Sequence, residues 1–243
     1  MPYLAHTGHA QLGALSLSFV GCTLTTVALG FIQWRVWLVS DREVISSGVA
    51  WVGVWRACFN SHTPVTPGNM VMHCRDISLT EAFTPPEIVA GQVLMLLSLL
   101  VGLCGNAGGV YALRNVYFGM GKNSPIRLAF ITSGTLCLMA AVMSLTPLLW
   151  NMSAVKNNQT IKFPPEFKLP PAPDSQRVGC GIWVGLIGTG LMLVSGIIFC
   201  TYRLPVRSQN LEGSSSVTDS RGTLASTSAA RGKDNLAFEV HEQ

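Results

Sequence analysis

Four long stretches of the chain contain apolar and small residues and not a single Asp, Glu, Lys or Arg. They run over residues 12–32, 88–113, 128–150 and 179–202. Each stretch reaches the roughly 20 residues that an α-helix needs to cross a hydrocarbon core of about 30 Å. A chain in lipid must also satisfy its own backbone hydrogen bonds, which a helix does. The pattern therefore predicts four transmembrane helices.

Two other interpretations of these stretches fit the pattern less well. Core helices of soluble proteins rarely run beyond 20 residues without a charge. A cleaved secretory signal has a shorter apolar part than residues 12–32 and a basic residue in front of it, whereas no Lys or Arg precedes this stretch. We interpret the first stretch as a retained membrane anchor.

The polar segments divide the rest of the chain. We expect an N-terminus (1–11), a first outer segment (33–87), an inner connector (114–127), a second outer segment (151–178) and a tail (203–243). The tail is rich in Ser, Thr and Gly and poor in large apolar residues, so it buries too little surface to offset the entropy of ordering and should be disordered.

Charge and modification signals indicate that both termini are cytoplasmic. The connector 114–127 carries three basic residues and no acidic one, which is typical of the cytoplasmic side. Two N-glycosylation sequons begin at Asn151 and Asn158, which would place the second outer segment outside the cell. Asn158 is the better acceptor because Asn151 lies at the membrane edge.

The residue pattern of the first outer segment predicts a β-hairpin cross-linked by a disulfide. Residues 43–55 are rich in Val, Ile and Trp and favour strands, residues 61–68 contain two prolines and a glycine typical of a turn, and residues 69–79 resume an extended pattern. Cys58 and Cys74 then lie near the two arms. A bond between them closes a loop with 15 residues between the cysteines and stabilises the fold by about 3 kcal/mol. Such a bond forms on the outer side of a membrane.

This arrangement resembles the claudin family of four-span membrane proteins. The resemblance covers residues 12 to about 203 and includes the tight inner connector and the Pro-rich second outer segment. The family signature is a tryptophan, then Gly-Leu-Trp-x-x-Cys, then a second cysteine. The matching residues here are Trp34, Gly53, Val54, Trp55, Cys58 and Cys74.

The chain also departs from the family pattern, so we expect a divergent member. Val54 replaces the usual leucine, and the cysteines are farther apart than in most claudins. The sequence "FTPPE" replaces the usual basic residue before the second span, and the final "HEQ" lacks the apolar ending that claudins present to scaffold domains.

The resemblance implies a fold and a function. It implies a left-handed four-helix transmembrane bundle with a small extracellular antiparallel β-sheet formed mainly by the first outer loop. Claudins associate side by side in one plasma membrane and face to face between cells, and so form the paracellular barrier of tight junctions. The implied partners are the lipid bilayer, further copies of the chain and other claudins. The alternative is a related protein of the peripheral myelin and epithelial membrane protein type, which organises membranes without forming junction strands.

The resemblance also assigns roles to residues of the first outer loop. Residues 34 and 53–55 would fix the sheet at the outer membrane surface, where Trp rings are favoured. In claudins, the residue after the second cysteine helps to set which ions pass, and here it is Arg75, followed by Asp76. A guanidinium beside a narrow path repels cations, but the adjacent carboxylate offsets it. Residues 33–87 carry four basic and five acidic residues, so we expect slight or no ion selectivity, with Arg75 either a selectivity residue or simply exposed.

Several further side chains have two interpretations. Phe163 and Phe167, spaced by prolines in the second outer loop, are either exposed contacts for a protein on the opposing cell or rings packed on the sheet or bundle. Gln92 and Asn106 should face the bundle interior and bond to neighbouring helices. Cys200, near the inner end of the last span, is a candidate for palmitoylation.

Composition and motifs argue against other classes of protein. The net charge of +4 is spread over every polar segment, so we expect no nucleic-acid partner. The five histidines show no metal-ligand spacing, no Cys-x-x-Cys pair occurs and the spans contain no acid or base. We therefore expect neither a cofactor nor an enzyme. The Cys-Cys-Gly motif of tetraspanins and the three cysteines per outer loop of connexins are also missing.

Overall fold

The computed structural model describes most of the first of two compact units, Met1–Pro205, and none of the second, Val206–Gln243. The predicted disordered tail therefore lies outside the described residues. The described residues are 9–40, 45, 47–62, 70–118, 126–170 and 172–202.

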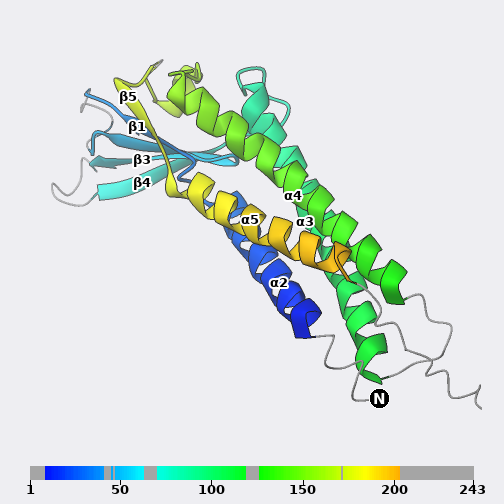
Figure 1. Cartoon of the computed structure of the whole chain (residues 1–243). Coiled ribbons are helices and arrows are strands. Elements are labelled where there is room, and N and C mark those ends of the chain that lie inside the picture. Colours follow the sequence, from blue (N-terminus) through cyan, green and yellow to red (C-terminus); the bar gives the residue numbers. More distant parts are fainter. Residues whose placement is uncertain are drawn as a thin grey trace, which may run out of the picture. The chain divides into compact units, whose positions relative to one another are not determined.

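Four helices form a bundle. They are α2 (His9–Gly30), α3 (Pro86–Phe118), α4 (Ile126–Lys156) and α5 (Cys180–Cys200). Helix α3 packs along α4, and α2 packs along α5 (Figure 1). All four are long and apolar enough to cross a membrane, which confirms the prediction of a four-span membrane protein.

Two of the helices are longer than the charge-free stretches that predicted them. Helix α3 has 33 residues and starts at Pro86, a residue suited to the first helical position because it has no N–H to leave unpaired. Helix α4 has 31 residues and continues through Asn151 to Lys156. The first six residues expected in the second outer loop are therefore helical.

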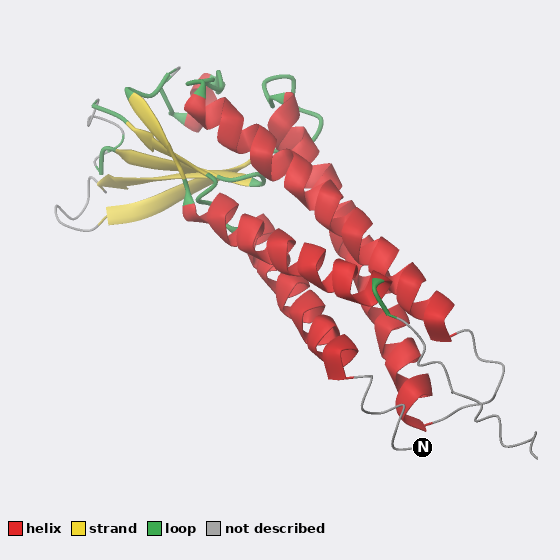
Figure 2. Ribbon diagram, viewed as in Figure 1, coloured by secondary structure: helices red, strands yellow, loops and turns green. Residues whose placement is uncertain are grey.

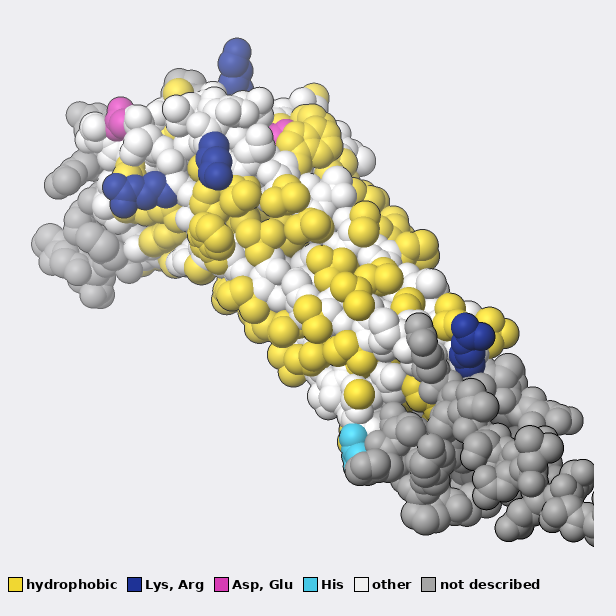
Figure 3. All heavy atoms as spheres, viewed as in Figure 1, with side chains coloured by type: hydrophobic (Ala, Val, Ile, Leu, Met, Phe, Trp, Pro, Cys, Tyr) yellow, Lys and Arg dark blue, Asp and Glu magenta, His cyan; other side chains and the backbone are white. Residues whose placement is uncertain are grey.

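The surface of the bundle is apolar and its interior contains polar groups. Leu100 is 61% exposed and Ile187 is 59% exposed. Yellow hydrophobic side chains cover the visible face of the helices (Figure 3). Buried Asn106 donates a hydrogen bond to Cys22 Sγ at 3.4 Å. This inside-out pattern is expected of helices surrounded by lipid, and it confirms the inward orientation of Asn106.

Glycines bring the helices close together, as small residues do in membrane bundles. A Cβ added at Gly185 of α5 would lie 2.7 Å from Leu148 Cδ2 of α4, and one added at Gly109 of α3 would lie 3.1 Å from Leu15 Cδ1 of α2. Larger side chains at these two positions would force the helices apart.

A five-stranded antiparallel sheet lies at one end of the bundle, where α2 ends and α5 begins (Figure 2). The strand order is β4-β3-β2-β1-β5. Four strands come from the segment between α2 and α3, and the fifth comes from the segment between α4 and α5. The fold class is confirmed, while the handedness of the bundle stays a prediction. The strands are β1 (Arg35–Leu38), β2 (Val49–Val52), β3 (Arg56–His62), β4 (Met70–Asp76) and β5 (Ser175–Val178).

The strands differ from the sequence prediction in one respect. Residues 43–55 do not form one strand, because β2 ends at Val52 and the chain turns before β3 begins at Arg56. The Gly53 N–H donates to the Arg56 carbonyl at 2.8 Å and closes this turn. The hairpin is formed by β3 and β4, so its first arm begins at Arg56, after the predicted arm 43–55, while its second arm lies within the predicted 69–79. Nearly all of the turn predicted at 61–68 lies outside the described residues.

Candidate functional site

The β3–β4 hairpin has two chemically different faces. Its register pairs Arg56 with Asp76, Cys58 with Cys74 and Phe59 with His73. Because side chains alternate along a strand, each cross-strand pair points to one face and the next pair to the other. One face presents an ion pair and two cysteines: Arg56, Asp76, Cys58 and Cys74. The other face presents an aromatic ring, an imidazole and a guanidinium: Phe59, His73 and Arg75.

A disulfide joins the two strands of the hairpin. Cys58 and Cys74 lie directly opposite each other, with their Cα atoms 4.2 Å apart. The predicted bridge is therefore present. It holds the register of the hairpin, and with it the face that presents Arg75.

The signature residues attach the sheet to the bundle. Buried Trp34 donates from Nε1 to the Ala28 carbonyl at the end of α2, at 2.7 Å. Gly53 lies so close to the chain leaving α2 that an added Cβ would be 2.8 Å from the Phe31 carbonyl oxygen. Val54 is buried, and its Cγ1 lies 2.8 Å from where a Cβ on Gly91 of α3 would be, whereas Trp55 is half-buried.

Gln92 adds a polar link between the sheet and α3. Its Nε2 donates to the carbonyl oxygens of Val54 and Ile77, at 2.6 Å and 2.9 Å. The expected interhelical bond of Gln92 is therefore wrong, since its partners are loop carbonyls. An amide at this position satisfies two backbone acceptors that burial removes from water.

A buried charge pair lies between β1, α3 and α4. The Arg35 guanidinium donates from Nη2 to Glu87 Oε1 at 2.9 Å and to Asn151 Oδ1 at 2.8 Å. Asn151 also donates to the Glu87 carbonyl at 2.7 Å. Arg35 is 0% exposed and Glu87 is 5% exposed. Burial lowers the pKa of Arg35, and the hydrogen bond and charge of Glu87 oppose that shift.

This cluster was not predicted from the sequence. Glu87 lies 52 positions and Asn151 lies 116 positions after Arg35 in the sequence, so no local pattern links the three residues. The sequence offered one signal, "FTPPE", in which the acidic Glu87 replaces the basic residue usual in claudins. A basic partner for this carboxylate could have been sought among the arginines of the chain. The cluster also corrects the prediction for Asn151, which is 1% exposed and hydrogen-bonded within α4 and is therefore closed to a glycan.

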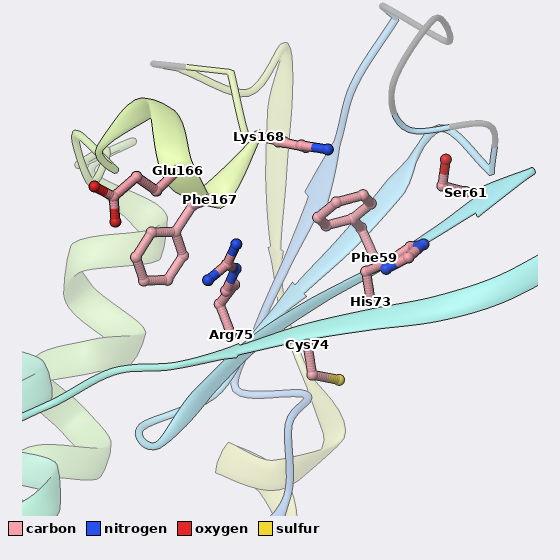
Figure 4. Close-up of a pocket in the computed structure, with 8 residues that line it drawn as sticks. All are labelled: Phe59, Ser61, His73, Cys74, Arg75, Glu166, Phe167 and Lys168. Carbon is pink, nitrogen blue, oxygen red and sulfur yellow. The ribbon is translucent and has the colours of Figure 1, made fainter.

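A cleft of about 530 Å³ separates the hairpin from the second outer loop. Figure 4 shows Phe59, His73 and Arg75 on the sheet side and Phe167 and Lys168 on the loop side. The loop forms a short 3₁₀ turn, η1 (Pro165–Phe167), which ends at Lys168 in a left-handed conformation with φ of 52°. That conformation is uncommon for a residue with a Cβ, and it is held by a bond from the Lys168 N–H to the Pro165 carbonyl at 3.1 Å.

The cleft contains more basic than acidic side chains. Its lining includes Arg75 and Lys168 against one carboxylate, Glu166. Asp76 does not offset Arg75 directly, because it points to the opposite face and accepts a bond from Arg56 Nε at 2.8 Å.

The second outer loop buries both phenylalanines. Phe163 packs against Trp37 with ring centres 5.4 Å apart, and Phe167 packs against Phe83 at 5.2 Å. Their exposed fractions are 8% and 7%. The interpretation as exposed contact residues is therefore wrong, and the packing alternative holds. Both rings help to fix the loop beside the sheet.

Two candidate modification sites have different surroundings. Asn158 is exposed just after α4, as an acceptor for a glycan must be. Cys200 is partly buried, and its sulfur lies 2.6 Å from where a Cβ on Gly134 of α4 would be, so the thiol faces the neighbouring helix. Glycosylation of Asn158 and palmitoylation of Cys200 stay predictions. Among the residues the structure describes, no group of three His, Cys, Asp or Glu side chains could hold a metal ion.

Comparisons with known proteins agree with this architecture. A family model described as PMP-22/EMP/MP20/Claudin tight junction matches residues 19–201. Claudin-3 of the dog is 24% identical over 192 residues, which are 78% of this chain and 81% of the relative. Human claudin-6 is 25% identical over 199 residues, 81% of this chain and 83% of the relative. Dog claudin-2 is 25% identical over 192 residues, 78% of this chain and 76% of the relative.

Proposed function

The chain belongs to the PMP-22/EMP/MP20/claudin family of tight-junction membrane proteins, and on this premise we propose that it polymerises between cells into a paracellular barrier. Copies would associate side by side in one plasma membrane and face to face across the intercellular space. The proposed partners are copies of this chain and other claudins. The role is structural, not catalytic.

The rigid attachment of the sheet to the bundle is the observation that carries this proposal. Strands from both outer segments pair in one sheet, the disulfide fixes β3 to β4, and Trp34, Gln92 and Arg35 bond the sheet to three helices or their ends. A surface that must match a copy on another cell benefits from such preorganisation, because less entropy is lost on association.

The proposed orientation places the sheet outside the cell and both termini in the cytoplasm. Asn158 would then be accessible to glycosylation, and the disulfide would lie in an oxidising compartment. Antibody access to epitope tags at the two termini, measured before and after permeabilisation of cells, tests this topology. Staining of either tag on intact cells would refute it.

Arg75 is the proposed selectivity residue of the barrier. It lies in the cleft with Lys168 and Glu166, so a small positive field faces any ion that passes along this side of the sheet. Because Asp76 is paired on the other face, Arg75→Asp should raise sodium over chloride permeability in epithelial monolayers. An unchanged ratio of sodium to chloride permeability would show that Arg75 does not set the ion selectivity.

Enrichment at cell contacts tests the adhesive part of the proposal. Fibroblasts that express the tagged chain should concentrate it where two expressing cells meet, and not where an expressing cell meets a parental one. Equal signal at both kinds of contact would argue against face-to-face association. The Cys58→Ser/Cys74→Ser double variant is the matched control, since it loses the staple that fixes the sheet.

One observation favours the alternative of a membrane-organising protein without junction strands. The second-loop phenylalanines are buried, so this loop offers no free aromatic anchor of the kind common at protein interfaces. This alternative predicts that the chain reaches the plasma membrane and remains dispersed there as single particles.

A further inference from the structure

A second, smaller recess lies on the hairpin side of the fold, away from the cleft described above. It has a volume of about 280 Å³ and is bordered by the end of α2 and by the turn between β2 and β3. Its volume lies just below the range typical of sites that enclose a drug-sized ligand, so it can hold a chemical group but not a whole lipid. The lining residues are Gly30, Phe31, Ile32, Trp55 and Arg56.

The recess lies at the boundary between the apolar helices and the polar sheet. Helix α2 ends at Gly30, and the next residue, Phe31, is 37% exposed. Just beyond it come the indole of Trp55 and the guanidinium of Arg56, which is exposed. Trp and Arg commonly anchor proteins at the level of lipid headgroups, so with α2 in the bilayer an apolar wall and a polar wall would meet here near the headgroups.

The Arg56 guanidinium is held in place by an ion pair and still has N–H donors for a further acceptor. Its Nε donates to Asp76 Oδ1 at 2.8 Å, and the two side chains are 60% and 81% exposed. Because this bond uses Nε, the Nη groups of the guanidinium can still donate to another acceptor. Phosphate oxygens suit the forked N–H donors of a guanidinium because they accept two parallel hydrogen bonds.

The net charge of the site determines which class of phosphate-containing headgroup it favours. The Arg56 and Asp76 side chains sum to zero, so a headgroup with a net negative charge gains from the guanidinium but is repelled by the carboxylate. A zwitterionic headgroup avoids this conflict: its phosphate meets Arg56, and its quaternary ammonium meets the carboxylate or the indole, which attracts cations to its face.

We propose that this recess binds the phosphocholine headgroup of an outer-leaflet lipid, with the phosphodiester on Arg56, the ammonium beside Trp55 and Asp76, and the first part of an acyl chain along Phe31. The bound lipid would fill the angle between α2 and the sheet and hold the hairpin at the membrane surface. This site is separate from the cleft that contains Arg75.

Lipid retention by the purified full-length chain tests the site. The protein is prepared in a maltoside detergent, mixed with phosphatidylcholine, and the bound lipid is counted by native mass spectrometry. Arg56→Gln should raise the apparent dissociation constant about tenfold, as expected when a charge-assisted hydrogen bond is lost. Diacylglycerol with the same chains lacks the phosphate, so it should bind more weakly to the wild type and respond little to this substitution.

A neighbouring arginine provides the matched control. Arg75→Gln makes the same change of charge in the next cross-strand pair but on the opposite face, so it should alter retention by less than about twofold, within the scatter expected of an uninvolved surface site. Asp76→Asn leaves Arg56 in place and removes the repulsion, so it should shift the preference of the protein from phosphatidylcholine toward phosphatidylglycerol. That shift decides the question even if Arg56→Gln fails to fold.

Three results would overturn the proposal. The first is unchanged phosphatidylcholine binding in folded Arg56→Gln. The second is an equal loss in Arg75→Gln, which would indicate general attraction to surface charge. The third is displacement of the lipid by soluble phosphocholine or inorganic phosphate at concentrations equal to that of the lipid, because the site would then recognise a free phosphate and not a membrane lipid.

Discussion

The buried pair of Arg35 and Glu87 gives the sharpest test of how the sheet is attached to the bundle. Replacement of Glu87 by leucine leaves the guanidinium uncompensated between β1, α3 and α4, where it is 0% exposed. Loss of one partner of a buried ion pair costs about 3 to 5 kcal/mol. For a chain of this size, that corresponds to a fall in the unfolding midpoint of about 6 to 20 °C.

The double variant separates the charge from the packing. Arg35→Met/Glu87→Leu replaces both members by apolar side chains, and such replacements of a whole buried pair are often neutral or stabilising. Asn151 then loses its acceptor role toward Arg35 but keeps its bonds to the carbonyls of Glu87 and Pro147. The double variant should therefore recover most of the stability that the single variant loses.

Thermal unfolding in detergent, followed by tryptophan fluorescence, measures these effects, since Trp34 and Trp37 are buried and lie one and two residues from Arg35 along the chain. The matched control is the exposed pair on the same sheet, where Arg56→Met/Asp76→Leu should change stability by about 1 kcal/mol or less. A Glu87→Leu midpoint within 2 °C of the wild type would refute the reasoning about buried charge, with that threshold set by the roughly 2 to 4 °C expected per kcal/mol. A double variant no more stable than Glu87→Leu would refute it as well.

Two further predictions concern single residues of the outer region. Gly53→Ala should destabilise the fold by about 1 to 3 kcal/mol, as overpacking does, because its Cβ would collide with the chain leaving α2; Gly13→Ala in α2, where a Cβ meets nothing within 4 Å, should be neutral or slightly stabilising in the same unfolding assay. Asn158→Gln should abolish the glycosidase-sensitive shift in gel mobility, while Asn151→Gln should leave the shift in place. A mobility shift that depends on Asn151 would contradict the buried position of that side chain.

The parts of the fold that are encoded locally were predictable from the sequence. The absence of charge over 12–32 and the other three stretches identifies the spans, because lipid penalises each charge directly. The β3–β4 hairpin was predicted in part, because the cysteines mark its pairing and its arms are close in sequence, but its first arm was expected at 43–55 and lies at Arg56–His62. The signature residues could be located but not explained until Gly53 was seen against the end of α2.

The parts that depend on distant partners were not predictable. Strand β5 pairs with β1 across about 140 residues, Arg35 opposite Val178, and four-residue strands carry little pattern of their own. The Arg35 cluster and the burial of Phe163 and Phe167 have the same origin, since each depends on which elements meet in space. A sequon shows that Asn151 could accept a glycan, but not that α4 continues far enough to bury it.

Freeze-fracture electron microscopy of fibroblasts that express the full chain tests most directly whether this family member polymerises. A rigid sheet with strands from both outer loops predicts continuous intramembrane strands where two expressing cells meet, and their loss in the Cys58→Ser/Cys74→Ser variant delivered to the cell surface. Dispersed particles at every contact of the wild-type cells would contradict the account and support a membrane-organising protein that builds no junction strands.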